Sequence, residues 1–250
     1  MDKETLKLPL RSAADLEQAV LALGVLPFFR GTVPGYSVQA MADPALWFTD
    51  EADGPWEWKG PVIRRGRVAY GKFFKGKAAY LRLDCLADYI NYRRMLTPLS
   101  ETPVEALGDL SDAELLRIIS GEGSVLSSDL KNMLGIGRPH RRRADEPVDV
   151  LGLGRMARGS GVRAGSALDA MLARLQMGGR LVIADFEYPT TASGRSYGWG
   201  LARYAAPEFL YGESIAEAGR TPLESRDRLI ATLAAAAPAV PHRTICSVIG

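Results

Sequence analysis

The sequence has few of the residues that indicate a particular chemistry. Its two cysteines, Cys85 and Cys246, lie far apart among apolar neighbours, so we expect buried thiols, without a disulfide or a metal between them. Its two histidines, His140 and His242, each lie between proline and arginine and lack metal-ligand spacing. We therefore expect no metal site and no cofactor.

Long apolar runs and a strong charge bias are also missing. No segment approaches the ~20 apolar residues of a membrane helix, and residues 1–10 lack the apolar region of a signal peptide. Cytoplasm is the expected location, without membrane contact. With 31 basic and 29 acidic residues, net charge alone does not indicate a nucleic-acid partner. Gly152-Leu153-Gly154 lacks the further glycine of a dinucleotide fingerprint.

Residues 165–204 show the clearest pattern in the chain. Four apolar residues recur at the spacing of one helix face: Leu168, Met171, Leu172 and Leu175. Ser166 is the expected N-cap, and Gly178-Gly179 the expected end. Alternating bulky residues then predict strands at 181–188 and 196–204, joined by a polar tip.

Two further helices are predicted upstream of this region. Ser111 and Glu114 have the spacing of a capping box, and Ser127 or Ser128 opens a short second helix. Three helices followed by a hairpin predict a winged helix-turn-helix module from about residue 107 to 204. The predicted fold class is therefore α+β, with a winged helix and an additional N-terminal α+β unit.

The chain divides into three predicted regions. Residues 1–97 form an α+β unit that also fits a distorted winged helix. It has helices at 15–26, 36–48 (interrupted at Asp43-Pro44) and 84–95, and strands at 62–65, 68–74 and 77–82. Residues 98–206 hold the winged helix with a basic insertion at 135–165. Residues 207–250 form a helical extension, in which Thr221 caps the last helix.

Clustered arginines are the best candidates for nucleic-acid contact, because guanidinium groups pair well with phosphate. A solvated loop is the alternative for the cluster, and packing between domains is the alternative for the third helix, whose second face is small and apolar. The predicted nucleic-acid-binding residues are Arg138, Arg141, Arg142, Arg143, Arg174 on the third helix and Arg195 at the wing tip.

Trp56-Glu57-Trp58 is the candidate pocket. Aromatic faces can hold a flat base, and a carboxylate can activate water. The alternative is a core-anchoring loop with Glu57 paired to Arg64 or Lys72. In a strand, Glu57 would point away from both tryptophans.

Three stretches, at 26–48, 54–94 and 170–200, resemble the AlkZ-related proteins, relatives of the AlkZ/YcaQ DNA glycosylases. The resemblance covers about two-thirds of the chain and implies tandem winged helices that handle DNA. Those enzymes carry a catalytic Gln-x-Gln or Gln-x-Asp motif, whereas Gln18, Gln39 and Gln176 are each followed by another residue type at the second position. No catalytic residue can be transferred from the family.

Three functions fit the sequence. The first is a winged-helix protein that binds double-stranded DNA weakly and salt-dependently, without glycosylase activity. The second is a glycosylase-like hydrolase of DNA repair that uses a carboxylate such as Glu57 or Asp185. The third is an interaction module whose winged helix packs on a protein partner.

Overall fold

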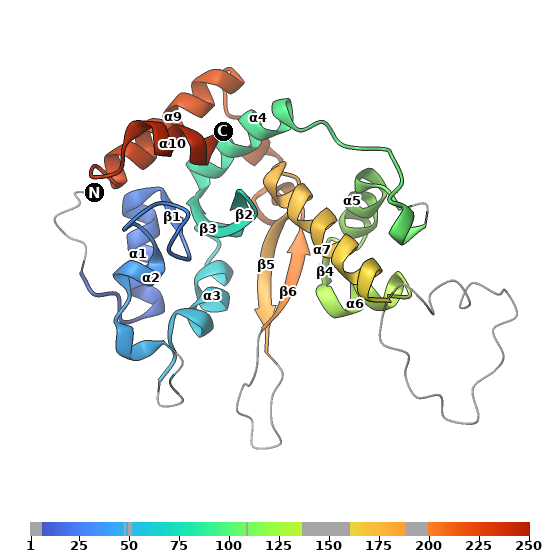
Figure 1. Ribbon diagram of the computed structural model, residues 1–250, viewed down its shortest axis with the longest axis horizontal. Helices are drawn as coiled ribbons and strands as arrows, with labels where there is room; N and C mark the ends of the chain where they lie inside the picture. The colour runs from blue at the N-terminus through green and yellow to red at the C-terminus, as the bar shows by residue number, and fades with distance from the viewer. Residues whose placement is uncertain (1–6, 48, 50–51, 109, 137–160, 189–199) are drawn as a thin grey trace, which may run out of the picture.

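The computed structural model describes residues 7–47, 49, 52–108, 110–136, 161–188 and 200–250, with the side chains of residues 161 and 162 excepted (Figure 1). These residues form a mixed α+β structure around one six-stranded sheet. Every strand pairing in the sheet is antiparallel. The predicted α+β class is therefore confirmed.

The first half of the chain follows the order helix, strand, helix, helix, strand, strand. Its elements are α1 (Ala13–Leu23), β1 (Val25–Pro27), α2 (Val38–Met41), α3 (Pro55–Arg64), β2 (Val68–Phe74) and β3 (Lys77–Arg82). A short 3₁₀ helix, η2 (Pro44–Leu46), follows α2, so the interruption predicted at Asp43-Pro44 is confirmed. The strands predicted at 68–74 and 77–82 are also confirmed.

The second half repeats this order. Its elements are α5 (Asp112–Gly121), β4 (Ser124–Leu126), α6 (Ser127–Met133), α7 (Gly161–Met177), β5 (Val182–Glu187) and β6 (Leu201–Ala205). Helix α4 (Leu83–Leu96) and the 3₁₀ helix η3 (Glu105–Leu107) connect the two halves. Ser111 caps α5 by accepting a hydrogen bond from the Glu114 amide, as predicted.

The strands of both halves join in one sheet, in the order β1-β3-β2-β5-β6-β4. Within each half the third strand lies between the first and the second. The halves meet where β2 pairs with β5, with Tyr70 opposite Ile183. The sheet is thus continuous across the predicted boundary at 97/98, and the division into three domains stays a prediction.

The C-terminal helices return to the first half. They are α8 (Pro207–Tyr211), the 3₁₀ helix η5 (Glu213–Ala216), α9 (Pro222–Ala236) and α10 (His242–Ile249). Figure 1 shows α9 and α10 beside α4, on the side of the sheet near the chain's C-terminus. The Asp88 carboxylate of α4, only 4% exposed, pairs with Arg220 and Arg228, and Tyr92 donates a hydrogen bond to the Gly250 carbonyl. These contacts attach the end of the chain to α4.

The strand predicted at 62–65 is wrong, because residues 55–64 form helix α3. Pro55 occupies the first helical turn, where its missing N–H costs nothing. The Glu57 carboxylate accepts a hydrogen bond from the Gly54 amide and so caps the helix start. The buried positions recur at helical spacing: Pro55, Trp58, Lys59, Val62 and Ile63. This periodicity outweighs the strand preference of Trp, Val and Ile.

Two details of the second half also differ from prediction. Helix α7 begins at Gly161, so Ser166 lies inside the helix and does not cap it. The three-residue strands β1 and β4 were not predicted, since three residues give too little alternation to detect. The buried face of α7 and its end before Gly178 are confirmed. The polar tip at 189–199 lies outside the described residues.

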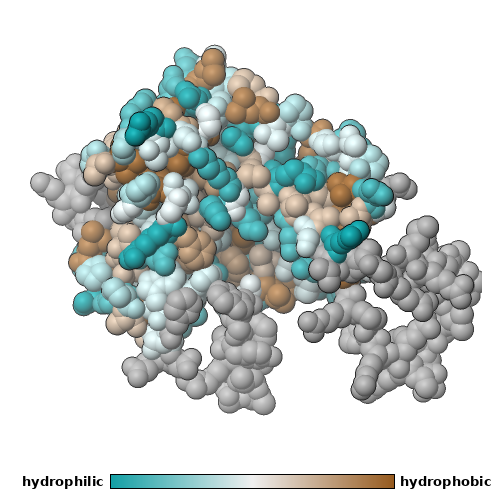
Figure 2. Space-filling model, in the orientation of Figure 1, coloured by the Kyte–Doolittle hydropathy of each residue, from teal (hydrophilic) through white to brown (hydrophobic). Residues whose placement is uncertain are grey.

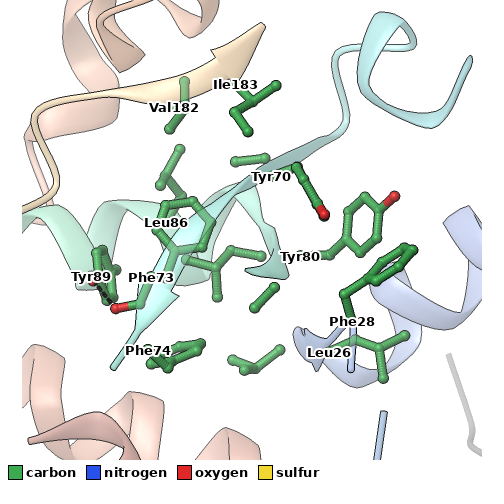
Figure 3. Close-up of a cluster of buried hydrophobic side chains, with 14 of the residues drawn as sticks. Leu26, Phe28, Tyr70, Phe73, Phe74, Tyr80, Leu86, Tyr89, Val182 and Ile183 are labelled. Atoms are coloured by element: carbon green, nitrogen blue, oxygen red, sulfur yellow. Dashed lines mark hydrogen bonds between the residues drawn. The ribbon is translucent and has the colours of Figure 1, made fainter. Parts of the chain in front are cut away.

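The core extends from the first half across the sheet to β5. Figure 3 shows Phe28, Tyr70 and Tyr80 on one side of this cluster and Val182 and Ile183 on another. The Tyr89 hydroxyl lies within hydrogen-bond distance of two carbonyl oxygens, those of Phe73 and Met177, and can donate to either. Figure 2 shows hydrophilic and hydrophobic residues interspersed on the face toward the viewer.

Candidate nucleic-acid interface

Most of the predicted DNA-contacting arginines lie outside the described residues: Arg138, Arg141, Arg142, Arg143 and Arg195. The elements that flank them are described. Helix α7 begins at Gly161, directly after the basic segment, and Arg195 lies in the sequence between the end of β5 and the start of β6. In Figure 1 the start of α7 and the tip ends of β5 and β6 lie along the lower part of the molecule.

Arg174 is described, and it connects α7 to α5. Its Nε and Nη2 donate to the two carboxylate oxygens of Asp112, at 3.0 and 2.7 Å. This paired geometry raises the pKa of Arg174 from its ordinary value. Its side chain is still 44% exposed, so contact with a ligand would have to share the guanidinium with Asp112.

Trp56-Glu57-Trp58 lies in the first turn of α3. Successive helical positions point about 100° apart, so the two indoles face different surroundings. Trp58 is 3% exposed, and its Nε1 donates to the Asp53 carbonyl at 2.9 Å. Trp56 packs against Phe28, Phe29 and Trp47, with ring centroids 5.5 to 6.1 Å apart. The two tryptophans do not form a facing pair.

Glu57 lies in helix α3, so the strand geometry expected for it does not apply. It also forms no ion pair with Arg64 or Lys72 in the described structure. Its carboxylate caps α3 through the Gly54 amide, at 2.9 Å. Arg64 instead pairs with Asp185 of β5, with Nη1 and Oδ1 2.7 Å apart. The pairing of Glu57 with Arg64 or Lys72 is wrong, because the carboxylate is engaged at the start of the helix and Arg64 is engaged by Asp185.

Lys59, which sequence reasoning missed as a site, lies at the centre of this aromatic cluster. Its Nζ is 4.4 Å from the ring centroid of Trp56, 4.1 Å from that of Phe186 and 5.9 Å from that of Phe28. The residue is 5% exposed. Burial lowers the pKa of Lys59 to about 8, although the nearby Glu57 raises it. The aromatic rings partly replace the water that the ammonium loses.

Further contacts join α3 to β5 around this lysine. The Tyr188 hydroxyl donates to the Trp56 carbonyl at 2.7 Å, and burial raises the pKa of that phenol above its ordinary value. Tyr80 is completely buried, and its hydroxyl has no hydrogen-bond partner among the described residues. A buried amine among aromatic rings is the main chemical feature here, and the Tyr188 and Arg64 contacts beside it join the two halves.

The three glutamines have structural surroundings. Gln176 is completely buried. Its Oε1 accepts from the Lys72 amide, and its Nε2 donates to the Leu172 carbonyl, both at 2.9 Å. Gln39 accepts a hydrogen bond from the Arg30 amide, and Gln18 is exposed on α1. Gln176 therefore joins α7 to β2 and has both ends of its amide engaged.

The described residues contain no group of three or more His, Cys, Asp or Glu side chains placed to hold a metal ion. No helix within them has the length and apolar character needed to cross a membrane.

The chain matches the family model described as "AlkZ related" over residues 10–250. Neither the curated proteins nor the solved structures contain a match to the chain.

Proposed function

The chain belongs to the AlkZ-related family, and on that premise we propose that it consists of two winged-helix modules and binds double-stranded DNA through the second. The observation that carries the proposal is the repeated order of elements in the two halves. Helix, strand, helix, helix, strand, strand, with the third strand between the other two, is the order of a winged helix. In this assignment α3 and α7 are the third helices.

The second module is the one proposed to contact DNA. Its third helix, α7, follows the basic segment with Arg138, Arg141, Arg142 and Arg143, and its hairpin carries Arg195 at the tip. Arginines at a helix start and a wing tip suit phosphate contacts, which fix a protein on the duplex without reading its sequence. Arg174 supports the interface indirectly by holding α7 against α5 through Asp112.

We further propose that the protein does not excise alkylated bases by the family's glutamine chemistry. Gln176 is buried with its amide engaged, and neither Gln18 nor Gln39 has the motif's second residue. Glu57, the carboxylate alternative, is occupied at the start of α3. A base-release assay on duplex DNA carrying a methylated purine tests this, with Glu57→Gln for comparison. Release by the wild type that is lost in Glu57→Gln would establish the hydrolase instead.

The DNA proposal is tested by the salt dependence of duplex binding. Each phosphate contact releases counterions, so the slope of log K against log salt reports their number. Replacing Arg141, Arg142 and Arg143 with alanine should weaken binding and reduce the slope by up to about 3. A matched control removes three exposed arginines elsewhere: Arg11, Arg117 and Arg243.

The control should leave the slope within about 1 of the wild-type value, since it removes the same charge without removing contacts. Equal slopes for the two triple variants would show that only net charge matters. A wild type without affinity for any duplex at low salt would refute the proposal and favour the protein-interaction function.

A further inference from the structure

A cavity of about 400 Å³ lies between the α4–α5 connection, the start of α5 and the end of α7. The connection contributes one wall, and in Figure 1 it arches from α4 over to α5. The cavity lies about thirteen residues along α7 from Gly161, which corresponds to roughly 20 Å of helix. It is therefore separate from the proposed DNA contacts at the start of α7.

Arg180 lines this cavity, and no ion pair to its guanidinium is found among the residues that the structure describes. Its Nε is buried and has no hydrogen-bond partner among the described residues. Two other arginines nearby are already paired: Arg174 with Asp112 and Arg94 with Glu208. Of these three described arginines, Arg180 is the one without an ion pair, and its side chain is half-buried.

The surroundings make this charge unfavourable in the unliganded protein. Burial lowers the pKa of Arg180 from its ordinary value, and the neighbouring Arg94 lowers it further, while Glu208 opposes both. A buried donor without a hydrogen-bond partner costs stability. A ligand that supplied a negative oxygen at this place would accept from that donor and remove the cost.

The remaining lining describes the rest of such a ligand. Thr97 and Thr102 are polar residues of the lining, and Leu99, Val104 and Leu175 supply apolar walls. Small-molecule sites commonly combine apolar walls with a few convergent polar groups in volumes of roughly 300 to 1,000 Å³. We propose that this cavity binds a small organic anion, in which a phosphate or carboxylate meets Arg180 and an apolar body lies against the connection.

The test uses three probes on the whole protein: phenyl phosphate, benzoate and inorganic phosphate. Calorimetry should show that phenyl phosphate or benzoate binds the wild type with a Kd below about 1 mM. Inorganic phosphate should bind more weakly because it has no apolar body. Preference between the two ring compounds identifies which anionic group the site takes.

The variant Arg180→Met keeps the length and apolar packing of the side chain while removing the charge. It should bind the preferred probe at least about tenfold more weakly, which is the loss of one charge-assisted contact. It should also unfold at the same or a higher temperature than the wild type, since an unpaired donor has been removed. The control Arg117→Gln, an exposed position on α5 outside the cavity, should bind like the wild type.

A second measurement needs no variant. Phenyl phosphate added to the labelled wild type should shift amide signals of residues 97–104 and 178–180 and leave those of α10 unchanged. Failure of both ring compounds to bind, undiminished binding by Arg180→Met, or shifts elsewhere would each overturn the proposal. If the wild type bound phenyl phosphate or benzoate but no DNA duplex, only the proposed function would be refuted.

Discussion

The two halves of the molecule share one order of elements but expose it differently. In the first half, β2 and β3 are joined by Lys75 and Gly76, whose positive φ angles of 50° and 70° suit a tight hairpin turn. Six of the seven residues of β2 are buried. In the second half, β5 and β6 are joined by residues 188–200, and β6 begins with an exposed residue and two half-buried residues.

The third helices differ in the same way. Helix α3 lies under aromatic residues of its own half and contacts β5, so its inward face holds the two halves together. Helix α7 packs its leucine stripe inward and begins beside a long segment of the chain. The comparison teaches that the same order of elements can give a hairpin buried in the core, as in β2 and β3, or a hairpin strand that starts at the surface, as in β6.

The largest expected effect separates two leucines, one in the third strand of each half, which lie at different positions along their strands. Leu81 of β3 is completely buried, whereas Leu201 of β6 is 37% exposed. Leu81→Ala should lower the free energy of unfolding by about 3 kcal/mol, because it leaves a cavity in the core. Leu201→Ala should lower it by less than about 0.5 kcal/mol. Chemical denaturation measures both free energies of unfolding. Equal losses in the two variants would contradict the difference in burial between the two strands.

The next effect concerns the closure of the first half by the C-terminal helices. Asp88→Ala should lower the free energy of unfolding by about 2 to 4 kcal/mol, since it leaves Arg220 and Arg228 without their buried partner. The control Asp227→Ala removes a carboxylate that is 74% exposed, and its effect should be at most about 0.5 kcal/mol. If Asp88→Ala behaved like the control, the C-terminal helices would contribute little to the core.

The smallest effect concerns Lys59. Replacement by methionine should raise the free energy of unfolding at pH 7 by about 1 kcal/mol, because the cost of a buried charge exceeds the gain from the rings. The pKa of Lys59 is about 8 in the folded protein, against an ordinary value of 10.5. The unfolded chain therefore binds more protons between these values, so wild-type stability rises with pH through that window.

The stability difference between Lys59→Met and the wild type should thus be largest below pH 8 and should shrink as the pH rises to about 10.5. Denaturation curves at several pH values measure it. The exposed control Lys77→Met should show no such dependence. A difference between Lys59→Met and wild type that stayed constant with pH would mean that Lys59 is not desolvated.

Sequence patterns predicted individual helices and strands better than they predicted the site. The leucine stripe of α7, the Ser111 cap and the hairpin strands β2 and β3 follow from spacing alone, because each depends on neighbours in the sequence. The short strands β1 and β4 do not, because their pairing partners β3 and β6 lie far along the chain. Without those strands the repeated order of elements could not be recognised.

The site residue Lys59 was missed for a related reason. Tryptophan, valine and isoleucine suggested a strand, whereas the buried positions of α3 recur at helical spacing. Counting that spacing would have placed a lysine on the apolar face, which is a rare position and therefore informative. The pairing of Arg174 with Asp112 joins helices 62 residues apart in sequence, and no local pattern reports such a contact.

The strand order β1-β3-β2-β5-β6-β4 has a symmetry of its own. Numbered within each half, it runs first, third, second, then second, third, first. Two identical subunits that paired through an edge strand around a two-fold axis would give the same order, and the antiparallel pairing of Tyr70 with Ile183 lies where that axis would pass. A homodimer must keep both copies alike. One chain that holds both copies has no such constraint, so the first copy can bury Lys59 while the second carries the arginine-rich segment.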